Sequence, residues 1–155
     1  MAFTYRKAEK SDARMLVELI NRAFVVEKPF FSTDRINLAD TLDHLEKGTF
    51  LLVEDKRKLA GCNYVELRDD SGYFGLLSIG PDYQGRGLGR LLVEHAEQFC
   101  RDAGRSLMRI RVLNHRVELP PFYRKLGYLQ AGIEEVEQEA AALMPYHFIV
   151  MEKPL

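Results

Sequence analysis

Apolar residues along this chain recur with two different spacings, and the spacing changes from one segment to the next. Where they recur every three or four positions, one face of a helix is indicated. Short runs rich in Leu, Val, Ile, Tyr and Phe that are bounded by polar turns indicate strands. We therefore predict strands at residues 3–7, 50–54, 59–67, 73–79, 107–112, 128–137 and 146–152. Helices are predicted at residues 13–24, 38–45, 88–103 and 119–126.

The boundaries of these elements carry signals of their own. Ser11 or Asp12 can cap the first helix, and Gly48 would end the second. Two prolines fall in the first turn of the last helix, where the missing N–H groups would not be bonded in any case. No periodicity marks residues 25–37, which we predict to be a loop, or the polar, Ala-rich stretch 138–145, which is either a turn or disordered.

The order of the elements predicts how the strands pair. The strands between residues 50 and 79 are joined by short polar turns, which predicts an antiparallel meander. The strand 73–79, the helix 88–103 and the strand 107–112 form a strand–helix–strand unit, which favours parallel pairing. The chain is therefore predicted to have an α/β (α+β) fold, with a mixed, mostly antiparallel central sheet of about six to seven strands and about four flanking helices.

Composition narrows the class of protein. With 155 residues, of which 46% are hydrophobic and 29% charged, the chain suits a single domain spanning residues 1–155. Its formal net charge is -1, so no general attraction to nucleic acid or to an anionic membrane is expected. Cys62 and Cys100 belong to no C-x-x-C or Cys/His cluster, so we expect two reduced, buried thiols and no metal site. No apolar signal core or membrane-length run is present, which predicts a cytoplasmic protein.

Three glycines lie between a predicted strand and the N-terminus of a long predicted helix: Gly85, Gly87 and Gly89. The free backbone N–H groups and the positive dipole end of a helix favour a phosphate at such a place. Glycines let the backbone approach a ligand closely, and Arg86 and Arg90 add charge that suits a pyrophosphate. The loop therefore predicts a site for a polyphosphate-bearing cofactor. The alternative is a glycine-rich turn that only connects two elements.

The loop does not match the two common nucleotide motifs. A Rossmann fingerprint requires G-x-G-x-x-G, but Arg90 occupies the position of its third glycine. A P-loop requires G-K-[ST], which is absent. The pattern Q/R-x-x-G-x-G/A does fit, as Gln84, Gly87 and Gly89, and it resembles the coenzyme A signature of the GNAT superfamily of N-acetyltransferases.

Other segments carry the same resemblance. Residues 5–12, YRKAEKSD, look like the first strand and helix entry of that family, and residues 122–128, FYRKLGY, are similar to its late Y-x-K-x-G-[FY] motif. The resemblance covers about residues 3–153. It implies a GNAT-like fold whose parallel strand pair is splayed around a coenzyme A site. It also implies transfer of the acetyl group of acetyl-coenzyme A, without a metal, to a primary amine of a small molecule or peptide.

The resemblance further implies which residues bind the coenzyme. These are Leu77, Ser78, Ile79, Gln84, Gly85, Arg86, Gly87, Leu88, Gly89, Arg90, Asn114, Phe122, Tyr123 and Lys125. Residues 77–79 would present backbone groups to the pantetheine arm, and the N–H of Ile79 would polarise the thioester carbonyl. Asn114 would bind the pantetheine arm, and Lys125 would face the adenosine phosphate. The alternative for Asn114 is an ordinary turn residue, and the alternative for Lys125 is a solvated surface lysine.

Acyl transfer from a thioester requires a neutral amine and, ideally, a proton for the departing thiolate. By resemblance Tyr123 supplies that proton, although an aromatic residue on this helix can also be core packing. The strand segment 75–79 contains no carboxylate that could act as general base. Glu66, His115, Glu118 or a water relay remain, and Glu66 is our first candidate.

The loop 25–37 and the late strands are predicted to select the acceptor. Phe30 and Phe31 could line an apolar pocket and Arg35 could clamp a carboxylate, while the alternative is that both rings pack under the loop as a minor core. The main competing function is a noncatalytic acyl-coenzyme A binding module or sensor. A nucleotide-binding regulatory domain is disfavoured by the two failed motifs. A homodimer through an exposed strand edge is compatible with the sequence.

Overall fold

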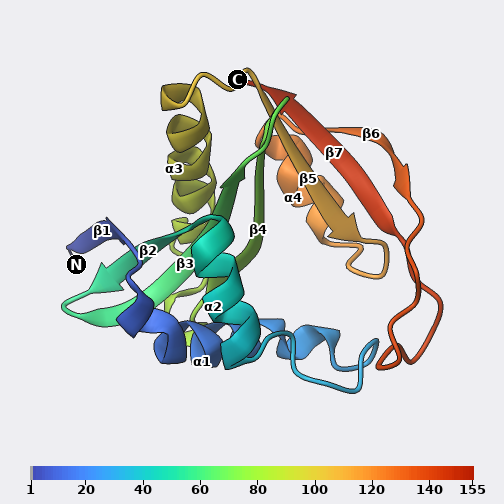
Figure 1. Cartoon of the computed structure of the whole chain (residues 1–155), viewed down its shortest axis with the longest axis horizontal. Coiled ribbons are helices and arrows are strands. Elements are labelled where there is room, and N and C mark those ends of the chain that lie inside the picture. Colours follow the sequence, from blue (N-terminus) through green and yellow to red (C-terminus); the bar gives the residue numbers. More distant parts are fainter. Residues whose placement is uncertain (1) are drawn as a thin grey trace.

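A computed structural model describes residues 2–155 and contains a seven-stranded sheet in the order β1-β2-β3-β4-β5-β7-β6 (Figure 1). The strands are β1 (Phe3–Lys7), β2 (Thr49–Asp55), β3 (Lys58–Leu67), β4 (Gly72–Ile79), β5 (Leu107–Leu113), β6 (Leu129–Glu134) and β7 (Phe148–Pro154). Neighbouring strands are antiparallel except β4 and β5, which are parallel. The predicted fold class is confirmed, including the meander β2–β3–β4.

Helices cover both faces of one half of the sheet and one face of the other half. They are α1 (Ala13–Ala23), α2 (Leu38–Lys47), α3 (Leu88–Asp102) and α4 (Leu119–Lys125), with 3-10 turns at Lys10–Asp12, Phe24–Glu27 and Pro81–Tyr83. α1 and α2 pack on one face of β2, β3 and β4, and α3 packs on the other face of the same strands. α4 lies on the α3 side, behind β5 and β7 in Figure 1. On the α1/α2 side, no helix of residues 2–155 covers β5, β7 and β6.

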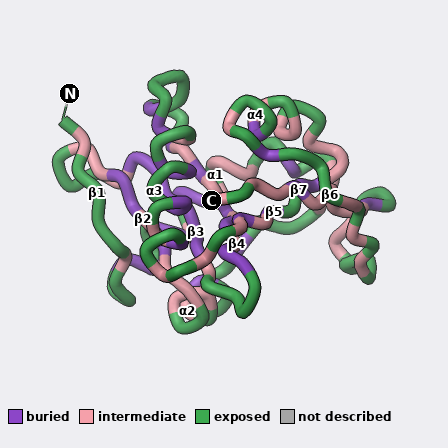
Figure 2. The backbone as a smooth tube through the Cα atoms, turned by 90° about the horizontal axis from the view of Figure 1, so that it is seen from above, coloured by how far each residue is buried: buried purple, intermediate pink, exposed green. Residues whose placement is uncertain are grey.

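The hydrophobic core lies on both sides of the sheet. On the α1/α2 side, the buried side chains are Leu16, Leu19, Ile20, Ile36, Phe50, Leu52, Cys62, Tyr64 and Leu76. On the α3/α4 side, they include Val65, Phe74, Val93, Ala96, Cys100, Met108, Ile110, Tyr123 and Tyr128. Figure 2 shows that buried backbone runs through the central strands, whereas the edge strands β1 and β6 are mostly exposed. Both cysteines are buried free thiols, as the sequence predicts.

β4 and β5 are paired only at their starts. Their register contains two pairs, the second of which joins Tyr73 to Arg109, and the strands then separate toward the bottom of Figure 1. On its other side β4 stays paired with β3, but the register shifts at Asn63. Opposite this point Leu76 has a φ of 56°, in the left-handed region. Such a bulge bends a strand. After Tyr73, the edge of β4 that faces β5 is thus left without a partner strand.

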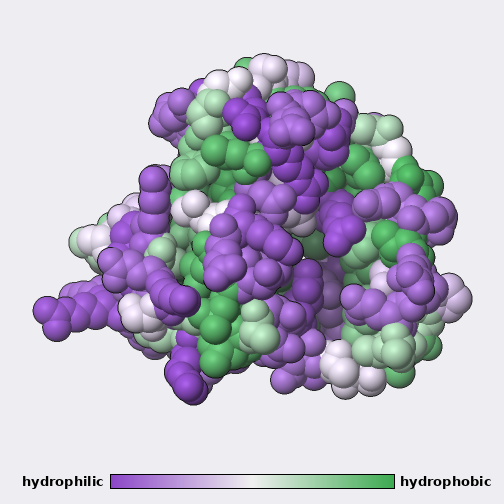
Figure 3. Space-filling view, viewed as in Figure 1, coloured by the Kyte–Doolittle hydropathy of each residue, from purple (hydrophilic) through white to green (hydrophobic). Residues whose placement is uncertain are grey.

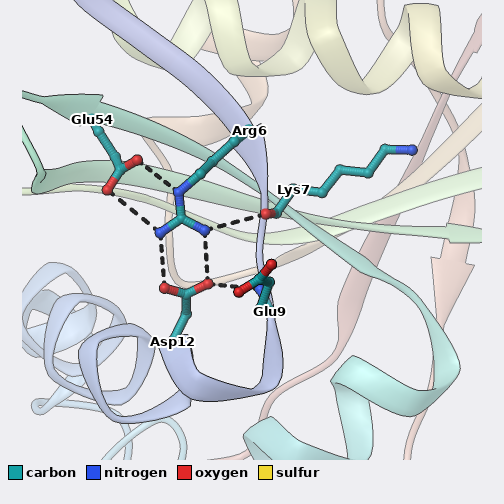
Figure 4. Close-up of polar contacts among 5 residues, drawn as sticks. All are labelled: Arg6, Lys7, Glu9, Asp12 and Glu54. Carbon is teal, nitrogen blue, oxygen red and sulfur yellow. Dashed lines mark hydrogen bonds and ion pairs between the residues drawn. The ribbon is translucent and has the colours of Figure 1, made fainter.

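The start of α1 is fixed by an ion-pair network. Asp12 accepts two hydrogen bonds of 2.8 Å from Arg6 and one of 2.7 Å from the backbone N–H of Glu9 (Figure 4). Arg6 also binds Glu54 at 2.7 Å. Asp12 is the N-cap residue of α1, as the sequence predicts, but its side chain makes no capping bond to α1. It points back to β1 and closes a capping box for the preceding 3-10 turn.

The α1–α2 connection and the β6–β7 connection bind to each other. Phe31 forms an antiparallel bridge with Ala142, flanked by two backbone hydrogen bonds of 2.9 Å. β6 is therefore shorter than predicted, because it ends at Glu134, whereas β7 keeps the predicted length but begins later, at Phe148. The chain between them turns away to reach the first connection. The Ala-rich stretch in this segment is a defined turn rather than a disordered segment.

Candidate active site

The glycine-rich loop joins β4 to α3 and is anchored at its start. Tyr83 is buried, and its hydroxyl donates a 2.9 Å hydrogen bond to Asp55. The following residues 84–87 are exposed. Gly85 and Gly87 have φ values of 78° and 77°, which side chains other than glycine rarely allow. A Cβ atom at either position would meet no atom within 4 Å, so the outer side of the loop is open to a ligand.

The N-terminus of α3 follows the loop directly. The first N–H groups of a helix have no partner within the helix, and the dipole of this 15-residue helix places partial positive charge at the same end. Arg86 and Arg90 are exposed on this turn, and Arg90 also binds Glu94 at 3.0 Å. A phosphate here would meet backbone donors, the helix dipole and guanidinium charge together.

The unpaired edge of β4 lies immediately before the loop and includes Leu77, Ser78 and Ile79. The Ser78 hydroxyl donates a 2.9 Å hydrogen bond to the carbonyl of Leu76, so its side chain is bonded within β4. The Gln84 amide donates a 3.4 Å hydrogen bond to the carbonyl of Ile79 and closes the turn. An extended ligand with amide groups can add to such an edge as a strand would.

α4 brings a buried phenol to the same gap. Tyr123 is 6% exposed and packs against three other aromatic rings. Its hydroxyl has no hydrogen-bond partner among residues 2–155. Burial raises the pKa of Tyr123 well above its usual value; the charge of Arg116 opposes this shift, and Tyr73 adds to it. The phenol is therefore protonated at neutral pH and able to donate a proton.

α4 also lies against the first turn of α3. The ring of Phe122 comes within 3.6 Å of the point that a Cβ on Gly89 would occupy, so this glycine lets the two helices approach each other. Beside them is a hollow of about 390 Å³, lined by Arg90, Val93, Glu94, Glu97, Phe122, Lys125, Leu126 and Lys153. This hollow adjoins the phosphate loop and has basic side chains at its rim.

These three features fit coenzyme A. The loop suits its pyrophosphate, the β4 edge suits the amides of its pantetheine arm, and the hollow between α3 and α4 suits its adenosine phosphate. Within residues 2–155, no group of three or more His, Cys, Asp or Glu side chains could hold a metal ion. Over the same residues, no helix has the length and apolar character needed to cross a membrane.

Residues 26–150 match the family model described as acetyltransferase (GNAT) domain. The chain belongs to the GNAT acetyltransferase family. The resemblance predicted from the two motifs is thereby confirmed, and so are the activity and the cosubstrate: the protein is an N-acetyltransferase that uses acetyl-coenzyme A. The noncatalytic alternative is not favoured.

Several known proteins are similar to this chain. Streptothricin acetyltransferase from Streptomyces lavendulae is 27% identical over 78 residues, which are 50% of this chain and 41% of that protein. The ribosomal-protein-S18-alanine N-acetyltransferase from Escherichia coli has a TM-score of 0.81 at 19% identity, covering 99% of this chain and 94% of that one. PaiA N-acetyltransferase from Thermoplasma acidophilum, solved with coenzyme A, has a TM-score of 0.78 at 16% identity, covering 100% of both chains. The two structures share the fold of this GNAT protein.

Glu66, our candidate base, does not lie beside Tyr123. It pairs with Tyr73 at the start of β4, on the α1/α2 side, whereas Tyr123 packs on the α3/α4 side. Its carboxylate accepts hydrogen bonds from Tyr64 at 2.8 Å and Arg68 at 3.1 Å. Burial opposes its ionisation, but these two bonds outweigh burial and lower the pKa of Glu66. Glu66 is thus ionised at neutral pH, and its role as base stays a prediction.

The other polar candidates of this GNAT chain are held by their neighbours. A ring nitrogen of His115 lies 2.8 Å from a backbone carbonyl oxygen of the β6–β7 connection. Glu118 binds Arg116 at 3.2 Å. Asn114 accepts a 3.0 Å hydrogen bond from the backbone N–H of His147, which extends the β5–β7 ladder. The predicted pantetheine contact of Asn114 would have to use its NH₂ group.

The predicted acceptor residues lie where the two connections meet. Phe30 stacks on the ring of His115 with 5.0 Å between centroids, and Phe31 meets the ring of Tyr146 edge-on at 5.1 Å. The guanidinium of Arg35 lies 5.4 Å from the centre of another phenylalanine ring of the same connection. These contacts agree with the minor-core alternative for the two rings, and acceptor binding by these residues stays a prediction.

Sequence reasoning missed Arg116. Its side chain is 15% exposed and binds Glu27 at 2.8 Å. Its positive charge acts to lower the pKa of Tyr123. The pair joins positions 89 residues apart, one in a loop without periodicity and the other in a turn. No local pattern could have identified it. It ties the α1–α2 connection to the segment that precedes α4, and so helps to fix the position of the phenol.

Proposed function

We propose that this protein transfers the acetyl group directly from acetyl-coenzyme A to a primary amine of a small molecule or peptide. The observation that carries the proposal is a meeting of three features at one gap: the unpaired edge of β4, the glycine loop that follows it, and the phenol of Tyr123. The names of two relatives, which refer to ribosomal protein S18 alanine and to streptothricin, support both kinds of acceptor.

Each residue then has a defined task. The backbone N–H groups of residues 85–90 hold the pyrophosphate, and the exposed backbone of residues 77–79 aligns the pantetheine arm. The N–H of Ile79 polarises the acetyl carbonyl. The coenzyme supplies an acetyl group already activated as a thioester.

The proton transfers complete the reaction. The acceptor nitrogen forms a bond to the acetyl carbon, the carbon–sulfur bond breaks, and Tyr123 gives its proton to the sulfur. The proton that the amine loses passes to Glu66 or to water, and Tyr123 recovers its proton from solvent. A cytoplasmic location and a homodimer stay predictions of the sequence.

The direct test is thiol release from acetyl-coenzyme A with a panel of polyamines, amino acids, aminoglycosides and short peptides. Gly87→Glu should abolish amine-dependent release, because it puts a carboxylate where the phosphate binds. Gly104→Glu is the matched control: Gly104 follows the other end of α3, has a φ of 81°, and is equally open around its Cβ position. Coenzyme binding without release for any amine would contradict the proposal and favour a sensor.

A further inference from the structure

The face of the sheet that no helix covers, formed by β5, β7 and β6 on the α1/α2 side, is hollowed. Figure 3 shows this face, with hydrophilic side chains around a depression between α2 and the β5–β7 strands. A hollow of about 210 Å³ on this face is lined by Arg68, Tyr73, Arg109, Arg111, Glu134 and Val150, among others. The charged side chains of this lining are three arginines and one glutamate.

This hollow, which we call the arginine hollow, adjoins the acyl-transfer gap. Tyr73 and Arg109 form the last pair between β4 and β5 before the two strands separate. Arg111 is two residues further along β5 on the same face, and its guanidinium extends over β7 toward Glu134 of β6, so it lines the β6–β7 side of the hollow. A molecule in the arginine hollow would therefore lie next to the place where the proposed function requires the acceptor amine.

Two of the arginines are held in position yet keep donors free. The Nε of Arg68 binds Glu66 at 3.1 Å, and its guanidinium lies 4.0 Å from the centre of the Tyr73 ring. The Nη1 of Arg111 binds Glu134 at 3.2 Å, and its guanidinium lies 4.2 Å from the centre of a phenylalanine ring of β7. Their other nitrogens make no hydrogen bond to residues 2–155. Planar donors fixed in this way suit the oxygens of an anion.

Each arginine of the arginine hollow is paired with a carboxylate. Arg68 binds Glu66 and Arg111 binds Glu134, while Arg109 is engaged by Glu152 at 2.7 Å and by Asp70 at 3.5 Å. These pairs leave no excess of positive charge beside the gap. An anionic group of the acceptor would therefore be held by hydrogen bonds from the unused donors of Arg68 and Arg111.

We propose that the arginine hollow binds an anionic group of the acceptor, so that the preferred acceptor is an amine that also carries a carboxylate or a phosphate. This inference rests on the proposed acetyl transfer and specifies its substrate class. From sequence alone, the task of holding a carboxylate was assigned to Arg35. Arg111, which lines the hollow and has unused donors, is better placed for it than Arg35, which stacks on a ring of the α1–α2 connection.

The test compares matched acceptors that differ in one anionic group. O-phosphoethanolamine is paired with ethanolamine, and amino acids are paired with their carboxamides, so the two sets distinguish phosphate from carboxylate. The anionic member of at least one set should have a kcat/KM about 10-fold higher or more. Arg111→Gln should remove most of this preference, and Arg111→Lys should keep part of it. Arg101→Gln, an exposed change in the last turn of α3, should leave it unchanged.

A second measurement does not need turnover. The Nε–Hε signal of Arg111 is followed by NMR during titration with acetate and with inorganic phosphate, in a Gly87→Glu background that removes phosphate binding at the glycine loop. A saturable shift of this signal supports the proposal.

Failure of the subsite and failure of the enzyme can be told apart. Equal kcat/KM values within both sets, or a preference that survives Arg111→Gln, would overturn the arginine hollow as a subsite while acetyl transfer stands. Loss of thiol release with all amines would instead overturn the proposed function, and the NMR titration would still decide the subsite, with an unmoved Arg111 signal counting against it.

Discussion

Replacing Tyr123 with phenylalanine separates chemistry from packing. The substitution removes one hydroxyl group from a ring that is otherwise buried among aromatic side chains. Because that hydroxyl has no hydrogen-bond partner among residues 2–155, no intramolecular bond is lost. The free energy of unfolding should therefore change by less than about 0.5 kcal/mol.

The expected kinetic effect is much larger. A positioned general acid typically contributes about 10²- to 10⁴-fold, and water can replace part of that contribution. We expect turnover to fall roughly 10- to 1000-fold, which corresponds to about 1.4–4 kcal/mol of transition-state stabilisation. Since burial raises the pKa of Tyr123, the wild-type rate should show no loss of this acid between about pH 6 and pH 9.

Tyr128→Phe provides the matched control. Tyr128 is also a buried residue, but its hydroxyl donates a 2.7 Å hydrogen bond to Glu97. Its loss should lower the free energy of unfolding by about 1.5–3 kcal/mol and leave turnover nearly unchanged in the folded protein. Steady-state rates, coenzyme binding by calorimetry and urea unfolding are measured for both variants. Unchanged turnover in Tyr123→Phe would remove Tyr123 from the mechanism.

Further predictions concern stability, the base and the thiols. Asp12→Asn should lower the free energy of unfolding by about 1–2 kcal/mol at pH 7. Hydrogen bonds from Arg6 lower the pKa of Asp12, so its contribution to stability should disappear only as the pH falls below about 4. If urea unfolding finds that Asp12→Asn lowers the free energy of unfolding equally at pH 7 and pH 2, the network is contradicted. Because a base Glu66 would be ionised at neutral pH, Glu66→Gln should lower the rate at neutral pH and remove the acid-side inflection of the rate profile, and an unaltered profile excludes Glu66 as base. Burial raises the pKa of Cys62 to about 12 and that of Cys100 to about 11, so a thiol reagent at pH 8 should label both only after unfolding; rapid labelling of the native protein would disprove this.

The fold could be predicted from the sequence because most of its elements are marked locally. Apolar periodicity identified α1 and α3, and polar turns identified the meander. The errors fall where a distant segment decides the outcome. β6 ends early because the chain turns toward Phe31, and the Asp12 side chain makes no capping bond to α1 because Arg6 on β1 binds it.

The candidate site also contains residues that local sequence patterns reveal and residues that they do not. The glycine loop could be recognised because a left-handed turn before a helix demands particular residues at fixed spacing. Arg111 and Arg116 could not, because each acts through partners from other strands or loops. An arginine that alternates with apolar residues on a strand is equally typical of an ordinary solvent-facing position. Only the missing helix over β5 turns this position into the wall of a hollow.

The two faces of the sheet explain how acid and base could work in one enzyme. The loop, the α3/α4 hollow and Tyr123 all belong to the α3/α4 side, so a coenzyme bound there leaves the open α1/α2 side as the approach for the acceptor. Glu66 lies on that second side, ionised, while Tyr123 on the first side stays protonated. A carboxylate in contact with the phenol would compete with the sulfur for its proton. Separation by the sheet leaves that proton for the thiolate, so the predicted base and the phenol can act from opposite faces.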